Sequence, residues 1–242
     1  MKKEVSLIVW ALITAILAPA QNVMVINDKN AEVRNVASFH GIRVSNAFDV
    51  IIKQGDEEAV VVSAVEDKYR SRIKTEVTNG VLRIWYDTDN VWKWNSDNKK
   101  LRAYVSVKNL DLLDISGATD VKIDGSLTGS NIRIELSGAS SLKGSISFES
   151  FKIEQSGASD SKLSGTVKNL DVEVSGASDF NCFELIAENC RAEASGASDV
   201  FVTVNTDLKV SASGASDVQY KGTASVSEMK TSGASSLKKR SK

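Results

Sequence analysis

The stretch Ser156-Gly157-Ala158-Ser159-Asp160 decides the fold of this chain, because its Ser-Gly-Ala core occurs seven times. Successive copies are separated by 21, 19, 19, 20, 18 and 19 residues. A constant period of this length is typical of a solenoid, in which each repeat is one small unit that stacks on the next. The seven glycines are Gly117, Gly138, Gly157, Gly176, Gly196, Gly214 and Gly233.

The residues between two corners predict short strands joined by tight turns. From Leu170 to Val174, apolar and polar side chains alternate with a period of two, which indicates a strand with one buried face. Gly125 and Gly165 mark a second corner in their units. A unit of about 19 residues cannot bury its apolar side alone, but stacked units can. We therefore predict an all-β fold, a right-handed parallel β-helix with coils about 4.8 Å apart.

The composition of the corner has a structural explanation. Glycine permits the positive φ of a sharp bend, and alanine is small enough to sit inside a corner. Serine and aspartate side chains bond to nearby backbone groups in turns. The repeats therefore argue for a fold more directly than for a reaction.

The N-terminal residues 1–20 resemble a secretory signal peptide. Lys2 and Lys3 precede an uncharged apolar run from Val5 to Ala18, and Ala18-Pro19-Ala20 supplies the small residues of a cleavage site. The run has 14 residues, whereas a membrane-spanning helix needs about 20. We expect cleavage and no transmembrane span in the mature chain; the alternative is an uncleaved anchor. The protein would be exported to the periplasm, the outer-membrane surface or the extracellular space.

The remaining chain divides by its pattern into four parts. Residues 21–35 form an N-terminal lead segment, residues 36–115 are strand-like but irregular, residues 116–236 carry the repeats, and residues 237–242 form a basic tail. The irregular part either begins the solenoid and caps one end, or forms a separate small β-domain.

Composition excludes some functions. The 30 basic and 31 acidic residues give a net charge of −1, which is no footprint for nucleic acid. The single histidine, His40, makes a histidine-based triad or a site with several histidine ligands hard to build. The only proline, Pro19, lies in the signal peptide, so the mature chain suits continuous strands.

Several short motifs occur in a fixed order along the chain. They are the Ser-Gly-Ala corners, preceded by Phe39-x-Gly41-Ile42, Phe48-Asp49-Val50, Gln54-Gly55 and Glu76-Val77-x-x-Gly80-x-Leu82-x-Ile84. Together they resemble the head GIN domain family of bacterial autotransporter adhesins. The resemblance covers about residues 36–236 and implies a right-handed β-helix on an exported protein, often from Bacteroidetes-type organisms.

Aspartates recur at one position of the repeat. Stacked carboxylates about 5 Å apart repel one another by roughly 0.8 kcal/mol per pair in water, so something must offset that repulsion. One interpretation is that each aspartate caps its own turn. The other is a calcium ladder, because Ca²⁺ takes several oxygen ligands; no other cofactor is expected. The four consecutive residues are Asp160, Asp179, Asp199 and Asp217, with Asp120 in an earlier unit and Ser141 and Ser236 in the other two.

Four aromatic residues gather in a stretch without repeats. Exposed rings surrounded by polar groups could contact a sugar or a protein partner; alternatively, the rings cover the solenoid core. These residues are Trp85, Tyr86, Trp92 and Trp94.

The two cysteines fall at inward positions of one coil. Alignment of the repeats places Cys182 where Leu163 stands and Cys190 where Leu170 stands. Export permits a disulfide, but the two positions could be too far apart for one, which leaves buried free thiols as the alternative.

These observations favour a non-catalytic, exported binding or adhesion module of the cell envelope. Its partner would be a glycan or an envelope or host protein, and the chain could self-associate. The alternatives are a polysaccharide-active lyase or hydrolase on the same fold, since β-helices also host such enzymes, and a purely structural envelope protein.

Overall fold

The computed structural model describes residue 26 and residues 28–88 and 99–241. The predicted signal peptide, Trp92 and Trp94 lie outside this part of the chain. Within it, no helix is both long and apolar enough to cross a membrane.

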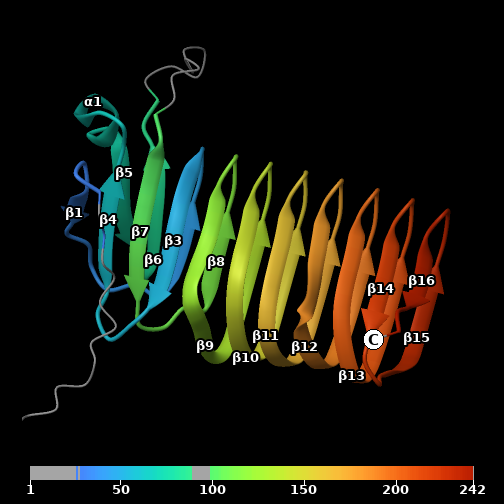
Figure 1. The fold of residues 1–242 in the computed structure, drawn as a ribbon. Coiled ribbons are helices and arrows are strands. Elements are labelled where there is room, and N and C mark those ends of the chain that lie inside the picture. The colour runs from blue at the N-terminus through green and yellow to red at the C-terminus, as the bar shows by residue number, and fades with distance from the viewer. Residues whose placement is uncertain (1–25, 27, 89–98, 242) are drawn as a thin grey trace, which may run out of the picture.

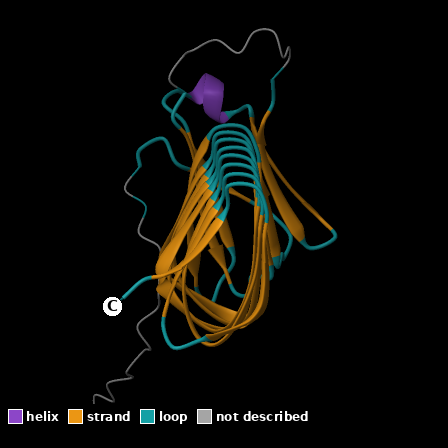
Figure 2. Cartoon of the chain, turned by 90° about the vertical axis from the view of Figure 1, so that its right-hand side faces the viewer, coloured by secondary structure: helices purple, strands orange, loops and turns teal. Residues whose placement is uncertain are grey.

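The repeats form a β-solenoid of about seven turns, which confirms the predicted architecture. Five long strands pair in parallel and in chain order (Figure 1). Each strand bends once, so that its first half lies on one face of a flattened coil and its second half on the other (Figure 2). We call these the first face and the second face. The strands are β9 (Asp120–Leu136), β10 (Ser141–Gln155), β11 (Asp160–Val174), β12 (Asp179–Ala194) and β13 (Asp199–Ala212).

Each coil is therefore one curved strand and one tight corner, rather than two or three short strands. Gly125 and Gly165, which were expected to end strands, have φ of 87° and 116° inside β9 and β11. The ladder between β10 and β11 continues through the bend without a register shift, whereas the ladders between β9 and β10 and between β11 and β12 shift register near it and resume beyond it.

The Ser-Gly-Ala corners stack backbone on backbone. Gly157 has φ of 79°, and the amide of Ala158 donates to the carbonyl oxygen of Gly138 in the previous coil at 2.8 Å. The alanines face solvent, so the expectation that they fill the corner was wrong. The residue after alanine lies inside: Ser140 is buried, and its hydroxyl donates to the carbonyl oxygen of Ser137 at 3.0 Å.

Three short strands complete the C-terminal end. β14 (Asp217–Lys221) continues the first face from β13 and pairs with β16 (Ser236–Lys239). β15 (Ser225–Thr231) continues the second face from β13.

The coils at the N-terminal end do not follow chain order. β3 (Phe48–Gln54) pairs with β9 on one side and β7 (Leu101–Val107) on the other. β2 (Gly41–Val44) likewise lies between β8 (Leu112–Ile115) and β6 (Val81–Tyr86). The coil made by β2 and β3 is therefore inserted between the regular coils and the later segment β6–β7.

Strands of reversed direction close this end. β4 (Ala59–Ser63) is antiparallel to β7, β5 (Ile73–Thr78) is antiparallel to β6, and β1 (Glu32–Arg34) is antiparallel to β4. Helix α1 (Asp67–Arg70) joins β4 to β5. Irregular and regular strands belong to one sheet and surround one apolar core.

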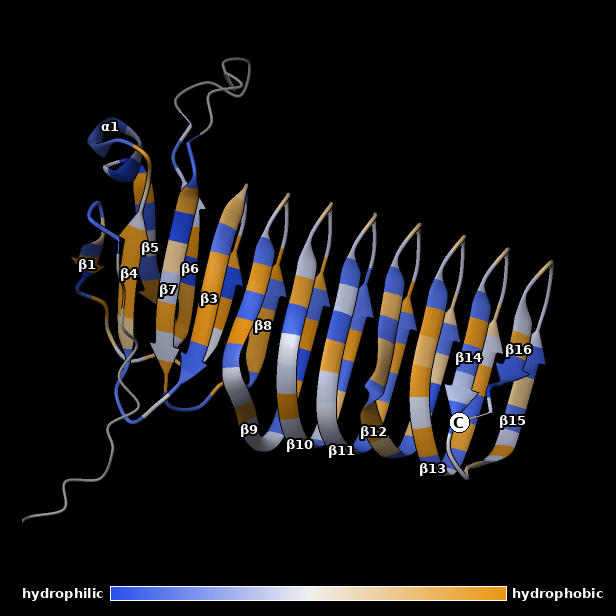
Figure 3. Ribbon diagram, viewed as in Figure 1, coloured by the Kyte–Doolittle hydropathy of each residue, from blue (hydrophilic) through white to orange (hydrophobic). Residues whose placement is uncertain are grey.

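The core consists of apolar rows that run through successive coils. Figure 3 shows apolar and polar residues alternating along the strands, as a half-buried strand requires. Burial of each large aliphatic side chain contributes about 1.5–3 kcal/mol, so the stack rather than any single coil holds the fold together. One such row is Ile134, Ile153, Val172, Ala192 and Val210.

Candidate functional site

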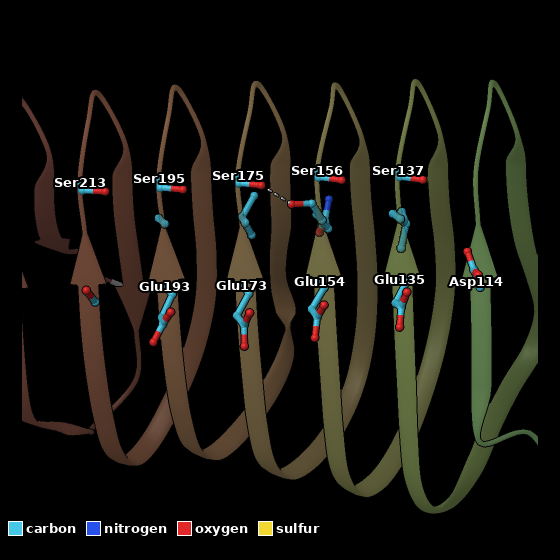
Figure 4. A pocket seen from close by; sticks show the side chains of 15 residues that line it. Asp114, Glu135, Ser137, Glu154, Ser156, Glu173, Ser175, Glu193, Ser195 and Ser213 are labelled. Carbon is cyan, nitrogen blue, oxygen red and sulfur yellow. Dashed lines mark hydrogen bonds between the residues drawn. The ribbon is translucent and has the colours of Figure 1, made fainter.

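A groove of about 370 Å³ lies on the second face of the solenoid, just below the corners (Figure 4). Figure 4 shows its two rows of side chains, carboxylates on the strands and serines where the strands enter the corners. It extends from β8 to β13. The carboxylate row is Asp114, Glu135, Glu154, Glu173 and Glu193, and the serine row is Ser137, Ser156, Ser175, Ser195 and Ser213.

The rows follow from the strand pattern. In the second half of each strand every other residue is buried, and these residues are apolar except for Gln155, so the residues between them point outward. Parallel pairing in register then places Glu135 beside Glu154, and Glu154 beside Glu173. Their spacing is that of adjacent strands, about 4.8 Å.

A second row, two residues earlier in each strand, partly neutralises these carboxylates. Lys152 Nζ lies 2.7 Å from Glu173 Oε1 and 3.1 Å from Glu154 Oε1, and Arg133 Nη2 lies 3.0 Å from Glu154 Oε1. The hydrogen bonds to Glu173 and Glu154 raise the pKa of Lys152, so the lysine stays charged. The groove therefore offers carboxylate oxygens as acceptors without a large net charge.

Asp171 interrupts this basic row. It lies opposite Lys152 on one side and Arg191 on the other, with Lys152 Nζ 3.8 Å from its Oδ2. Burial raises the pKa of Asp171, and its buried Oδ1 accepts no hydrogen bond from the described residues.

The serine row carries hydroxyls that are largely unengaged. Ser175 Oγ donates to the carbonyl oxygen of Gln155 at 3.2 Å. The other four hydroxyls form no hydrogen bond with residues in the described part of the chain. Hydroxyls and carboxylates repeated at the coil spacing can donate to and accept from a ligand that is itself rich in hydroxyl or amide groups.

The predicted aspartate ladder is present on the first face, outside this groove. Asp160, Asp179, Asp199 and Asp217 are consecutive partners in parallel strands. Burial is the first cause that raises the pKa of Asp199, and the charges of Asp179 and Asp217 add to it. Among the residues that the structure describes, no cluster of three or more potential ligands could hold a metal ion. Calcium binding stays a prediction.

The aromatic stretch is only partly described. Trp85 lies half-buried on β6, with the guanidinium carbon of Arg83 5.1 Å from its ring centre. Tyr86 is 4 % exposed and belongs to the core, because the alternation along β6 turns it inward. For this residue the structure favours the alternative that the rings cover the solenoid core over an exposed contact. Trp92 and Trp94 lie outside the described residues.

The cysteines occupy the expected core positions. Cys190 lies opposite Leu170, and Cys182 Sγ accepts from the amide of Leu163 at 3.2 Å. Both are free and buried in this structure, and burial raises the pKa of both thiols far above the usual range.

Sequence reasoning missed the groove. Its signal was visible, because a glutamate follows an aliphatic residue at the same place in four repeats: Ile134-Glu135, Ile153-Glu154, Val172-Glu173 and, with alanine, Ala192-Glu193. The pattern alone does not reveal that this row lies below a line of open hydroxyls.

Comparison with known proteins identifies a matching family and several structures of the same fold. A family model described as "Putative auto-transporter adhesin, head GIN domain" matches residues 38–224. A solved structure described as a putative adhesin from Bacteroides fragilis has a TM-score of 0.79 at 19% identity, covering 88% of this chain and 98% of that one.

Two structures from Parabacteroides distasonis are also similar. One, described as a putative adhesin, has a TM-score of 0.71 at 17% identity and covers 87% of this chain and 96% of its own. The other, described as a putative lipid binding protein, has a TM-score of 0.64 at 18% identity and covers 88% and 98%. No curated protein matches the chain. At these identities the likeness shows the fold alone.

Proposed function

We propose that this chain, which belongs to the head GIN domain family, is a non-catalytic, exported binding module of the cell envelope. It holds a glycan or protein ligand against its solenoid. The adhesin descriptions of the family and of the similar structures support an adhesion-like role. The N-terminal signal-peptide pattern supports export.

The groove on the second face is the observation that carries this proposal. It is long and shallow rather than enclosed, and it presents the same two side-chain types in coil after coil. A reaction needs a unique constellation of groups held around one atom, whereas repeated acceptors and donors suit an extended ligand with its own repeat. The open serine hydroxyls are available to such a ligand without breaking contacts within the described part of the fold.

Binding of the mature protein, residues 21–242, to arrays of bacterial and host glycans and to envelope proteins tests the proposal. The double variant Ser156→Gln/Ser195→Gln fills the groove without removing a hydrogen bond of these two hydroxyls. We expect ligand binding to weaken by about tenfold or more, with an unchanged melting temperature. Ser130→Gln, an exposed change on β9 outside the groove, is the matched control. Absence of any bound ligand, or equal binding by both variants, would contradict the proposal.

Polysaccharide cleavage is a second candidate, and Asp171 is the observation that favours it. A carboxyl whose pKa is raised by burial can serve as a general acid. Glu173 lies two residues further along the same strand, and Glu154 lies on the neighbouring strand β10. Release of new reducing or unsaturated ends from a glycan, abolished in Asp171→Asn but not in Asp114→Asn, would establish this function in place of simple binding.

A further inference from the structure

The first face carries a row of stacked lysines. Lys122, Lys143 and Lys162 are register partners on β9, β10 and β11, and all three side chains are exposed. They therefore lie one above another at the strand spacing of about 4.8 Å. We call these three residues the lysine row.

The lysine row differs from the cations of the second face. There Arg133 and Lys152 each have two or more carboxylates within 4 Å. Among the described residues, none of the three lysines of the row forms an ion pair or a hydrogen bond through its side chain. Like charges on adjacent strands are unfavourable, and no direct ion pair within the described part of the chain offsets the charges of this row.

In the coils that follow the lysine row, an aromatic pair lies near the equivalent position. In β12 the equivalent residue is Asn181, and in β13 it is Phe201, the partner of Asn181. The Phe201 ring lies 5.3 Å from the ring of Phe183, at an angle of 47°, and Lys221 Nζ lies 4.5 Å from the Phe183 ring centre. A bulge between Cys182 and Ile186 interrupts the register at this place.

A row of carboxylates runs alongside. Asp120 and Asp160 stand two residues before Lys122 and Lys162, and the alternation turns both types outward. A ligand lying along this face therefore meets cations and carboxylates side by side. The carboxylates accept hydrogen bonds from hydroxyl donors, and the ammonium groups donate to anions.

We propose that the lysine row and the Phe183–Phe201 pair form a track for an acidic polysaccharide, a linear polymer of uronate-type sugars. Uronate carboxylates pair with the lysines, sugar hydroxyls donate to the neighbouring aspartates, and one sugar ring lies on the aromatic pair. The inference rests on the proposed binding function and adds to the groove a second surface, on the first face, with its own ligand class. A nucleic acid fits less well, because its phosphates carry no donor for the aspartates.

Titration of the mature protein with polygalacturonate tests the track, with neutral dextran as the comparison polymer. The triple variant Lys122→Gln/Lys143→Gln/Lys162→Gln should bind polygalacturonate about tenfold or more weakly, and binding of the original chain should weaken with added salt. Lys29→Gln/Lys108→Gln/Lys168→Gln is the matched control. It removes the same charge from exposed positions outside the row and should bind as the original chain does.

Several results would overturn the track. These are no binding of polygalacturonate, equal loss in both triple variants, or tighter binding of duplex DNA or of phosphatidylserine vesicles. The groove variant Ser156→Gln/Ser195→Gln separates the two proposals. If it alone abolishes polygalacturonate binding, the binding function stands and the lysine track fails; if no glycan or envelope protein binds at all, both fail.

Discussion

Gly117 stacks on Asn46 so closely that a Cβ added to the glycine would lie 2.1 Å from the Asn46 carbonyl oxygen. The amide of Ala118 donates to that same oxygen at 2.6 Å. Asn46 has φ of 85°, the conformation of the glycines in the corners above it. Residues 45–49 are thus an eighth corner, in which asparagine stands for glycine, and the stack of corners continues one coil beyond the first Ser-Gly-Ala.

The corner at Asn46 predicts a larger loss of stability for Asn46→Ala than for Asn46→Gly. Its side-chain Oδ1 accepts from the amide of Tyr86 at 3.0 Å, and asparagine tolerates a positive φ better than most residues. Asn46→Ala loses both advantages and should destabilise the protein by roughly 2–4 kcal/mol. Asn46→Gly keeps the positive φ, so it should destabilise the protein by about half as much as Asn46→Ala. Urea unfolding of both variants measures the difference; equal losses would show that φ does not matter here.

The regular corners predict a severe effect of a single methyl group. A Cβ at Gly157 would lie 2.5 Å from the Gly138 carbonyl oxygen, and φ is 79°. Gly157→Ala should lower the free energy of unfolding by roughly 3 kcal/mol or more. Gly125→Ala is the control, because φ is 87° there but nothing lies within 4 Å of the added Cβ, so only the conformational cost of about 1–2 kcal/mol remains. Similar losses for the two would refute the role of stacking.

Gln155 predicts a stabilising substitution. It occupies the buried row in which Leu136 and Val174 are its register partners, and its Oε1 has no hydrogen-bond partner in the described structure. Gln155→Leu removes that buried acceptor together with the hydrogen bonds that its Nε2 donates to Ser159 and Asp179 at 3.3–3.4 Å. Because those bonds are long and weak, the free energy of unfolding should rise by about 1 kcal/mol. Val174→Gln, which adds a buried amide to the same row, should lower it. A less stable Gln155→Leu protein would indicate that the amide is satisfied in solution.

Asp199 predicts a pH dependence of stability. Burial raises its pKa above the ordinary 3.8, and Asp179 and Asp217 raise it further. The folded chain therefore binds more protons than the unfolded chain between these pKa values, so stability falls as pH rises through that window. Asp199→Asn should be the more stable protein at pH 7, by less than about 1 kcal/mol, and its advantage should vanish below about pH 4.

Thermal unfolding of both proteins across this pH range measures the effect. Added salt should shrink the advantage, because it screens the repulsion from Asp179 and Asp217 but not the effect of burial. An Asp199→Asn protein less stable at pH 7 would mean that the carboxylate makes a favourable contact instead.

The repeating part of the fold could be predicted from the sequence, because every coil has the same physical requirements and shows them in the same residue pattern. Positive φ at each corner demands glycine, and alternation demands an apolar residue at every inward place, so Leu170 and Cys190 could be paired by alignment alone. For Tyr86 the sequence left an exposed and a core position open, although its alternation with Leu82 and Ile84 along one strand indicates the buried side.

The sequence by itself determined the coil: its length, its glycine corner, its inward rows and the stacking of Asp160 on Asp179. Each of these is a local requirement that recurs with the period. Only the tertiary structure decided which coils are neighbours, since β2 and β3 lie between β8–β9 and β6–β7. It also decided which rows of like charge are neutralised. Lys152 finds glutamates on its own and the neighbouring strand, whereas the side chain of Lys143 finds no partner among the described residues. That difference depends on the orientation of side chains across separate coils, which no single repeat encodes.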